Sequence, residues 1–210
     1  MRKERDGEST KAVVLKAARQ AFADHGFAGT SLAMISQACG ISDGLILHHF
    51  KSKENLYRMV QEDLAAEYLQ VINQAAARAQ DERQIALQTL RAAFQYWSED
   101  TAYYRISLWA YLENQSALIE SEARLTAGLA EKVKEMQIHG QADDRFSPVA
   151  LLTMTIGPLH FWVRHREEFR RTLRLDASPE QLNRDFEEEF VQMIMKLYQP
   201  LMKDQAVNKA

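Results

Sequence analysis

Apolar residues recur at helical spacing along almost the whole chain, and no stretch alternates as a half-buried strand would. The first clear stripe includes Val13, Ala17 and Ala21, with Thr10 as a cap before it and Gly26 as a stop after it. The pattern predicts an all-α protein of about nine helices, at residues 11–25, 31–39, 42–49, 53–79, 84–99, 102–114, 116–139, 148–166 and 179–201.

Helix length divides the chain into two parts. The first three predicted helices are short and are joined by turns of a few residues, whereas the helices after residue 53 are longer. We therefore predict a compact three-helix domain at residues 1–52 and a larger helical domain at residues 53–210.

Charge is distributed unevenly between the two ends of the chain. The whole sequence has a formal net charge of −3, yet residues 1–60 contain nine Lys and Arg against six Asp and Glu. A positive end on an acidic protein suggests an anionic partner for that end alone.

Nothing in the sequence suggests export. Cys39 is the single cysteine, so no disulfide can form within the chain. The first eight residues lack an apolar run, and the uncharged stretch 146–163 contains too many polar residues for a membrane span. We expect a cytoplasmic protein without a membrane partner.

Signatures of catalysis are weak. Residues 40–44 match the Gly-x-Ser-x-Gly pattern formally, but that motif requires a strand before the serine, and a helix is predicted there. His48 and His49 are adjacent, so on a helix they cannot form the i, i+4 pair that holds a metal. We expect no enzyme activity, no metal and no cofactor.

Residues 31–53 follow the plan of a helix-turn-helix. A helix at 31–39, a glycine-containing turn and a second helix at 42–49 suit a unit whose second helix enters the DNA major groove. That short helix needs anchors, for which we expect Ile41, Ile46 and Phe50 to pack inward.

The residues around this unit resemble a known family. The runs LKAARQAF at 15–22, HGFAGTS at 25–31, ISQACGIS at 35–42 and GLILHHFKSKENL at 44–56 are similar to the N-terminal domain of TetR/AcrR-type transcriptional regulators. The resemblance covers about residues 10–60. It implies a helix-turn-helix DNA-binding domain followed by a helical ligand-binding and dimerisation domain.

The resemblance also implies partners and site residues. Such a protein binds double-stranded operator DNA as a homodimer and releases it when a small-molecule effector binds. Together with the exposed positions of the second helix, the resemblance suggests these DNA-binding residues: Thr30, Ser31, Ser42, Asp43, Leu45, Leu47, His48, His49, Lys51 and Lys53.

Leu47 departs from the family pattern, which often has tyrosine at this position. Leucine cannot donate a hydrogen bond to phosphate, so we expect Leu47 either to touch a thymine methyl group or to pack inward. Protonation of His48 would add an ionic phosphate contact, which makes pH-sensitive DNA affinity a hypothesis.

Aromatic residues are concentrated in the C-terminal part of the chain. Most of them can simply fill a core, but polar-tipped aromatics and the Gly157–Pro158 interruption also suit a ligand cavity. The ligand-binding residues that we predict are Trp97, Tyr104, Trp109, Tyr111, Met154, His160, Phe161 and Trp162.

The last predicted helix has one continuous apolar stripe, which suits a core or a dimer interface. Because the resembled family pairs its last two long helices with those of a second chain, we predict the interface. Its residues are Phe186, Phe190, Met193, Ile194, Leu197 and Leu201.

These features together predict a ligand-responsive transcriptional regulator, most simply a repressor released by a mostly apolar or aromatic effector. The alternative is an all-helical small-molecule-binding protein or enzyme without sequence-specific DNA binding. Salt dependence of DNA affinity separates the two.

Overall fold

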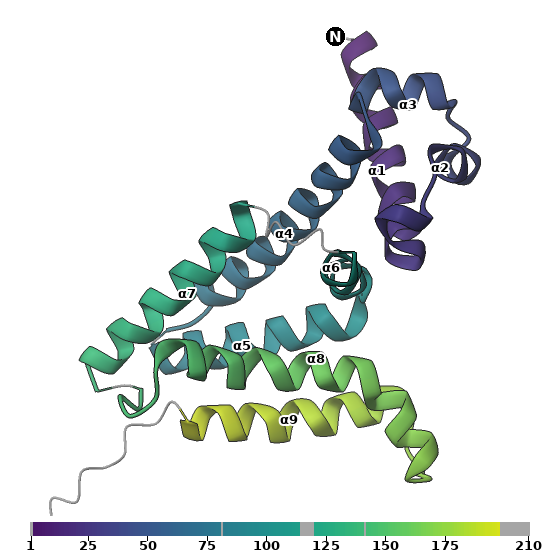
Figure 1. Ribbon diagram of the computed structural model, residues 1–210. Helices are drawn as coiled ribbons and strands as arrows, with labels where there is room; N and C mark the ends of the chain where they lie inside the picture. Colours follow the sequence, from purple (N-terminus) through teal and green to yellow (C-terminus); the bar gives the residue numbers. More distant parts are fainter. Residues whose placement is uncertain (1, 81, 114–119, 141, 198–210) are drawn as a thin grey trace, which may run out of the picture. The chain divides into compact units, whose positions relative to one another are not determined.

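The computed structural model describes residues 2–80, 82–113, 120–140 and 142–197, and every regular element in them is a helix (Figure 1). This confirms the predicted all-α fold. The helices of the described residues are α1 (Arg2–Gly29), α2 (Leu32–Cys39), α3 (Asp43–Phe50), α4 (Lys53–Ala77), α5 (Glu82–Glu99), α6 (Ala102–Leu112), α7 (Glu120–Ile138), α8 (Pro148–Thr172) and α9 (Pro179–Leu197).

The chain forms two compact units. The N-terminal unit comprises residues 1–69 and 100–122, and the C-terminal unit comprises residues 70–99 and 123–210. The units therefore divide differently from the boundary expected after residue 52. Helix α6 is grouped with α1, α2 and α3, although about thirty residues of the other unit precede it in the chain.

The core of the N-terminal unit lies between α1, α3 and the start of α4. Phe22, Ile46 and Phe50 have no exposed surface. Phe22 also meets the ring of Tyr57 edge-on, with 4.9 Å between the ring centroids. Ile46 and Phe50 are thus the anchors of α3, as predicted, while Ile41 is only half-buried.

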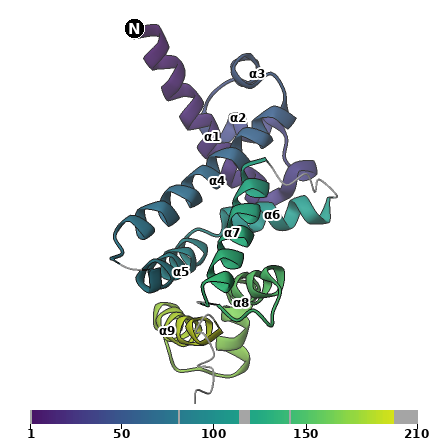
Figure 2. The same cartoon turned by 90° about the vertical axis from the view of Figure 1, so that its left-hand side faces the viewer.

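Helices α5, α8 and α9 pack against one another in the C-terminal unit, and Figure 2 shows α9 nearly end-on. Their contact is aromatic: the Trp162 and Phe186 rings stack with centroids 4.2 Å apart, and Phe94 lies 5.8 Å from Phe186. Helix α7 packs on α8 through Val133 and Leu151. Most of the aromatic residues in this unit therefore pack in its core, which is one of the two roles that the sequence allowed.

Helix α8 is longer than predicted, because it continues past residue 166 to Thr172. Two features support the extension: Arg170 and His165 form i, i+3 pairs with acidic neighbours, and Phe169 packs near Trp162. The helix also runs through Pro158 without an interruption.

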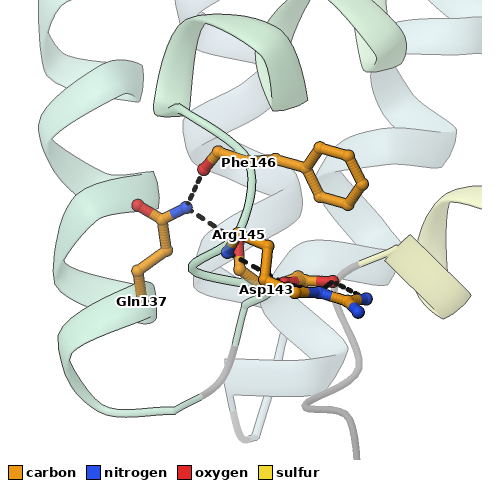
Figure 3. Close-up of polar contacts among 4 residues, drawn as sticks. All are labelled: Gln137, Asp143, Arg145 and Phe146. Carbon is orange, nitrogen blue, oxygen red and sulfur yellow. Dashed lines mark hydrogen bonds and ion pairs between the residues drawn. The ribbon is translucent and has the colours of Figure 1, made fainter.

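The turn between α7 and α8 is held by side chains (Figure 3). The Gln137 amide donates hydrogen bonds to the carbonyl oxygens of Asp143 and Phe146, at 2.9 and 2.6 Å. Arg145 binds the Asp143 carboxylate through two nitrogens and keeps the pKa of that carboxyl below its usual value. Ser147 then caps α8 by accepting from the Ala150 amide.

No helix in the described ranges combines the length and the apolar character that a membrane crossing needs.

Candidate nucleic-acid interface

Residues that are near in sequence determine where the helices of the helix-turn-helix begin and end. The Ser31 hydroxyl accepts from the Met34 amide at the start of α2, and Ser42 accepts from the Leu45 amide at the start of α3. Gly40 ends α2 with a φ of 70°, a conformation that glycine adopts without strain. The short α3 is therefore defined by a cap at its start and by two buried side chains beneath it.

The outer face of α3 is open. Ser42, Asp43 and His48 are exposed, and Leu45 and Leu47 keep 42% and 40% of their surface accessible. The exposure of Leu47 argues against inward packing, and its contact with a thymine methyl group stays a prediction. Two accessible leucines on a helix of this kind suit contact with thymine methyl groups or sugars.

Backbone amides add to this face. The N-termini of α2 and α3 are opened by exposed hydroxyl residues, Ser31 and Ser42, which leaves first-turn N–H groups available to an anion. Lys51, the C-cap of α3, is also exposed, and its ammonium donates one hydrogen bond, of 2.9 Å, to the carbonyl oxygen of His48. Because an ammonium has three donors, Lys51 keeps donors for a phosphate.

Thr30 is placed differently from the prediction. Its side chain is 2% exposed, and its hydroxyl donates to the carbonyl oxygens of Ala21 and Gly26 at 3.0 and 2.7 Å. The hydroxyl therefore ties the end of α1 together and is not available to a phosphate.

Lys53 also serves the interior of its unit. Its ammonium donates to the carbonyl oxygens of Phe27 and Thr30, both at 2.9 Å, and lies 4.2 Å from the centre of the Phe27 ring. With its charge committed to these partners, Lys53 acts as a clamp on the turn before α2. His49 is half-buried near Gly7 of α1.

The predicted ligand-binding residues are divided between the two units. Tyr104, Trp109 and Tyr111 lie on α6 in the N-terminal unit, whereas the other five lie in the C-terminal unit. Trp109 faces α1, where its indole nitrogen donates to the Ala23 carbonyl oxygen at 3.2 Å. Tyr111 is 76% exposed.

Within the C-terminal unit, two of the predicted ligand-binding residues meet. The His160 and Trp97 rings are 4.7 Å apart, and burial lowers the pKa of His160 below its ordinary value. Phe161 and Met154 are exposed on α8. A groove of about 300 Å³ lies elsewhere, between α5 and α9, and is lined by Leu87, Arg91, Glu188, Val191, Gln192, Met195 and Lys196, none of them predicted.

The stripe on α9 is split between core and surface. Phe190 and Ile194 are each 2% exposed, so their own chain already covers them, whereas Met193 is 47% exposed. Phe186 is half-buried in the aromatic core. Leu201 lies outside the described residues, as does the side chain of Leu197.

Exposed apolar side chains gather on α8 instead, and sequence reasoning did not assign them to an interface. Val149, Ile156 and Phe161 keep 68%, 36% and 56% of their surface. The sequence signal for this exposed face was the spacing of seven residues between Val149 and Ile156, which places both on one side of a helix.

Sequence reasoning also missed a contact between α6 and α1. Arg105 and Glu113 reach α1 from the same face of α6 as Trp109, because the three residues are spaced by four. The sequence shows this spacing, and with it a shared helix face, but it does not show which helix that face contacts.

Curated proteins with similar sequences are bacterial regulators. The repressor AcnR of Corynebacterium glutamicum is 38% identical over 61 residues, which cover 29% of this chain and 32% of that protein. The match thus spans about a third of AcnR. The regulator TtgR of Pseudomonas putida is 24% identical over 185 residues, covering 77% of this chain and 84% of TtgR.

Solved structures share the fold. The transcriptional regulator SCO4942 of Streptomyces coelicolor superposes with a TM-score of 0.74 at 21% identity, over 91% of this chain and 99% of that chain. A TetR family regulator of Marinobacter aquaeolei VT8 gives 0.73 at 20% identity, over 94% and 98%.

Two family profiles match the chain. The profile of bacterial regulatory proteins of the tetR family covers residues 14–60, which include the helix-turn-helix. The profile of the tetracyclin repressor-like C-terminal domain covers residues 87–192. The protein therefore belongs to the TetR family of DNA-binding transcriptional regulators, which are not enzymes.

Proposed function

We propose that this regulator is a repressor that binds a pseudopalindromic operator as a homodimer and is released by a small, mostly apolar or aromatic effector. The observation that carries the DNA-binding part is the face of α3, which is anchored by buried Ile46 and Phe50 and exposes Ser42, Leu45 and His48. Side chains on this face reach base edges and phosphates when such a helix enters the major groove.

The contacts divide into two kinds. Ser31, Ser42 and Lys51 contact phosphates, together with the first amides of α2 and α3, and so set the position on the duplex. Leu45 and Leu47 touch the base edges. In a dimer, the two copies of α3 must lie about 34 Å apart to reach successive major grooves.

The exposed apolar face of α8 supports the homodimer. Val149, Met154, Ile156 and Phe161 are all on this helix, and Met193 of α9 is exposed as well. Several exposed apolar side chains on one helix are typical of an interaction site. A second copy of the chain covers α8 and the exposed part of α9 in this proposal.

The effector is proposed to bind the C-terminal unit, where Trp97, His160 and Trp162 supply aromatic surface and polar tips. The effector changes the population of DNA-binding dimers only by its difference in affinity for the two states. Helix α4 is continuous in the chain from the N-terminal to the C-terminal unit and provides one of the three covalent connections between them.

Selection of binding sites from a random duplex pool with the purified protein tests this proposal. A two-fold symmetric consensus with half-sites about one helical turn apart is the expected result. Absence of enrichment by a folded dimer would contradict operator binding by the free protein. A consensus without symmetry would contradict the homodimer.

A further inference from the structure

The turn that precedes the helix-turn-helix begins at a break in α1. Gly26 has a φ of 71° and a ψ of −178°, so the helix does not continue regularly into Phe27. In an unbroken helix the Phe27 amide would donate to the carbonyl oxygen of Ala23. The break leaves this amide, the next amide and that carbonyl in need of other partners.

Helix α6 supplies partners on both sides of the break. The Glu113 carboxylate accepts from the amides of Phe27 and Ala28, each at 3.0 Å, one through each oxygen. The Ala23 carbonyl oxygen accepts from Arg105 at 2.8 Å and from the Trp109 indole at 3.2 Å. Side chains of one face of α6 therefore replace the helical hydrogen bond that Gly26 interrupts.

The far end of the same turn is held by a charge of opposite sign. The Lys53 ammonium binds the carbonyl oxygens of Phe27 and Thr30. A carboxylate at the amide end and an ammonium at the carbonyl end match the direction of the peptide dipoles. Ser31, the cap of α2, follows directly, so this four-residue turn determines where the DNA-contacting helices begin.

We propose that Glu113 is a positioning residue for operator binding, although it is the C-cap of α6 and lies outside the helix-turn-helix. Its two charge-assisted hydrogen bonds hold the turn at residues 27–30, and through it the start of α2, in the arrangement that fits DNA. This inference rests on the proposed operator binding. It adds a residue that neither DNA contact nor the sequence motif identifies.

Loss of these bonds leaves the fold intact, because Glu113 is half-buried and Ala28 is exposed, so water can replace the carboxylate. The turn then samples more orientations, and only part of the population fits the operator. Apparent affinity falls by that fraction. Random-sequence DNA does not require one fixed orientation, so non-specific binding changes little.

Glu113→Gln tests the proposal, because it keeps the shape of the side chain but removes the charge and one acceptor. The matched control is Glu62→Gln, which changes the net charge equally within the same unit, where Glu62 pairs with Arg58 on the surface. Removing a negative charge from a DNA-binding unit favours DNA by itself. A loss of affinity in Glu113→Gln therefore has the sign opposite to the charge effect.

The measurement is fluorescence anisotropy with two duplexes, the selected consensus and a random-sequence duplex of the same length, combined with amide exchange. Glu113→Gln should bind the consensus about tenfold more weakly, which is the order expected for one charge-assisted hydrogen bond. It should bind the random duplex within twofold of wild type. The amides of Phe27 and Ala28 should exchange faster. Glu62→Gln should leave their exchange unchanged and should bind both duplexes at least as tightly as wild type, because it only removes a negative charge.

Three outcomes overturn the inference. Consensus affinity within twofold of wild type would show that the bonds only stabilise the turn, and unchanged amide exchange would show that they do not hold it. Equal losses on both duplexes would indicate general destabilisation. Glu113→Asp, which keeps the charge but draws the carboxylate back, gives the same test if Glu113→Gln does not fold. If the wild-type protein selects no consensus, the proposed operator binding is rejected, and the positioning role of Glu113 is rejected together with it.

Discussion

Lys51 and Lys53 are two residues apart, yet the structure gives their charges different roles. Lys51 is exposed beside the start of α4 with one intramolecular hydrogen bond, whereas Lys53 is bound to two carbonyl oxygens and covers an aromatic ring. An exposed ammonium contributes to DNA binding by releasing counterions. A committed ammonium contributes to the stability of its own unit.

Lys51→Ala should therefore weaken DNA binding uniformly across sequences and reduce the slope of log K against log salt by about 0.9. Lys53→Ala should instead lower the urea midpoint of the N-terminal unit. Titrations at several salt concentrations, with urea unfolding of both variants, check this. A reduced salt slope for Lys53→Ala with unchanged stability would show that Lys53 contacts phosphate after all.

Gly26 is a second residue whose role depends on its surroundings. Its φ of 71° is in the region that favours glycine, and an added Cβ would lie 2.5 Å from a Glu113 oxygen and 2.9 Å from the Trp109 indole. Backbone strain and steric overlap therefore act together here.

Gly26→Ala should lower the free energy of unfolding by about 1–3 kcal/mol. Gly128→Ala is the matched control, because Gly128 is exposed within α7 with nothing near its Cβ position, and it should stabilise by about 0.4–1 kcal/mol. Urea unfolding followed by circular dichroism measures both. Equal effects of the two substitutions would contradict this account of Gly26.

At the scale of elements, α8 presents two faces with different tasks. One face carries buried Leu151, Leu159 and Trp162 against the core of its unit, while the exposed face carries Val149, Ile156 and Phe161. The apolar stripe of α9, by contrast, is largely buried against other helices of the same chain. We therefore expect the proposed contact with a second copy to depend more on α8 than the sequence suggested.

Ile156→Glu should weaken the dimer, because a carboxylate in an apolar interface loses its hydration. The control is Ile85→Glu on α5, since the two isoleucines have similar exposure, 36% and 39%. Sedimentation velocity across a concentration series measures the dissociation constant. Dimers of equal strength in both variants would place the interface away from this part of α8.

At the scale of the whole molecule, acid acts on the C-terminal unit through a buried histidine. Burial lowers the pKa of His160, in the C-terminal unit, below its ordinary value of 6.5. The unfolded state therefore binds a proton that the folded unit does not bind. Stability of this unit falls as the pH drops from about 7 toward the lowered pKa.

His160→Phe should flatten this pH dependence, while His139→Gln, at an exposed position, should leave it unchanged. The tryptophans make the measurement specific to one unit. Of the three, Trp97 and Trp162 lie in the C-terminal unit, so a Trp109→Phe background reports that unit alone. Urea midpoints that do not depend on pH in the His160-containing protein would contradict the prediction.

The sequence by itself determined the helices, their caps and the helix-turn-helix. Ser31, Gly40 and Ser42 act within a few residues of the chain, so local spacing is enough to predict the ends of α2 and α3. The buried anchors Ile46 and Phe50 follow from the same short-range pattern.

Only the tertiary structure decided what each exposed or polar side chain meets. Thr30 and Lys53 look like phosphate contacts in sequence, yet carbonyl oxygens of their own unit bind them. Phe190 looks like an interface residue, yet its own chain covers it, and Glu113 carries no motif at all. A periodic pattern shows which residues share a helix face, but the partner of that face lies far away in sequence, and only the packing of helices brings the two together.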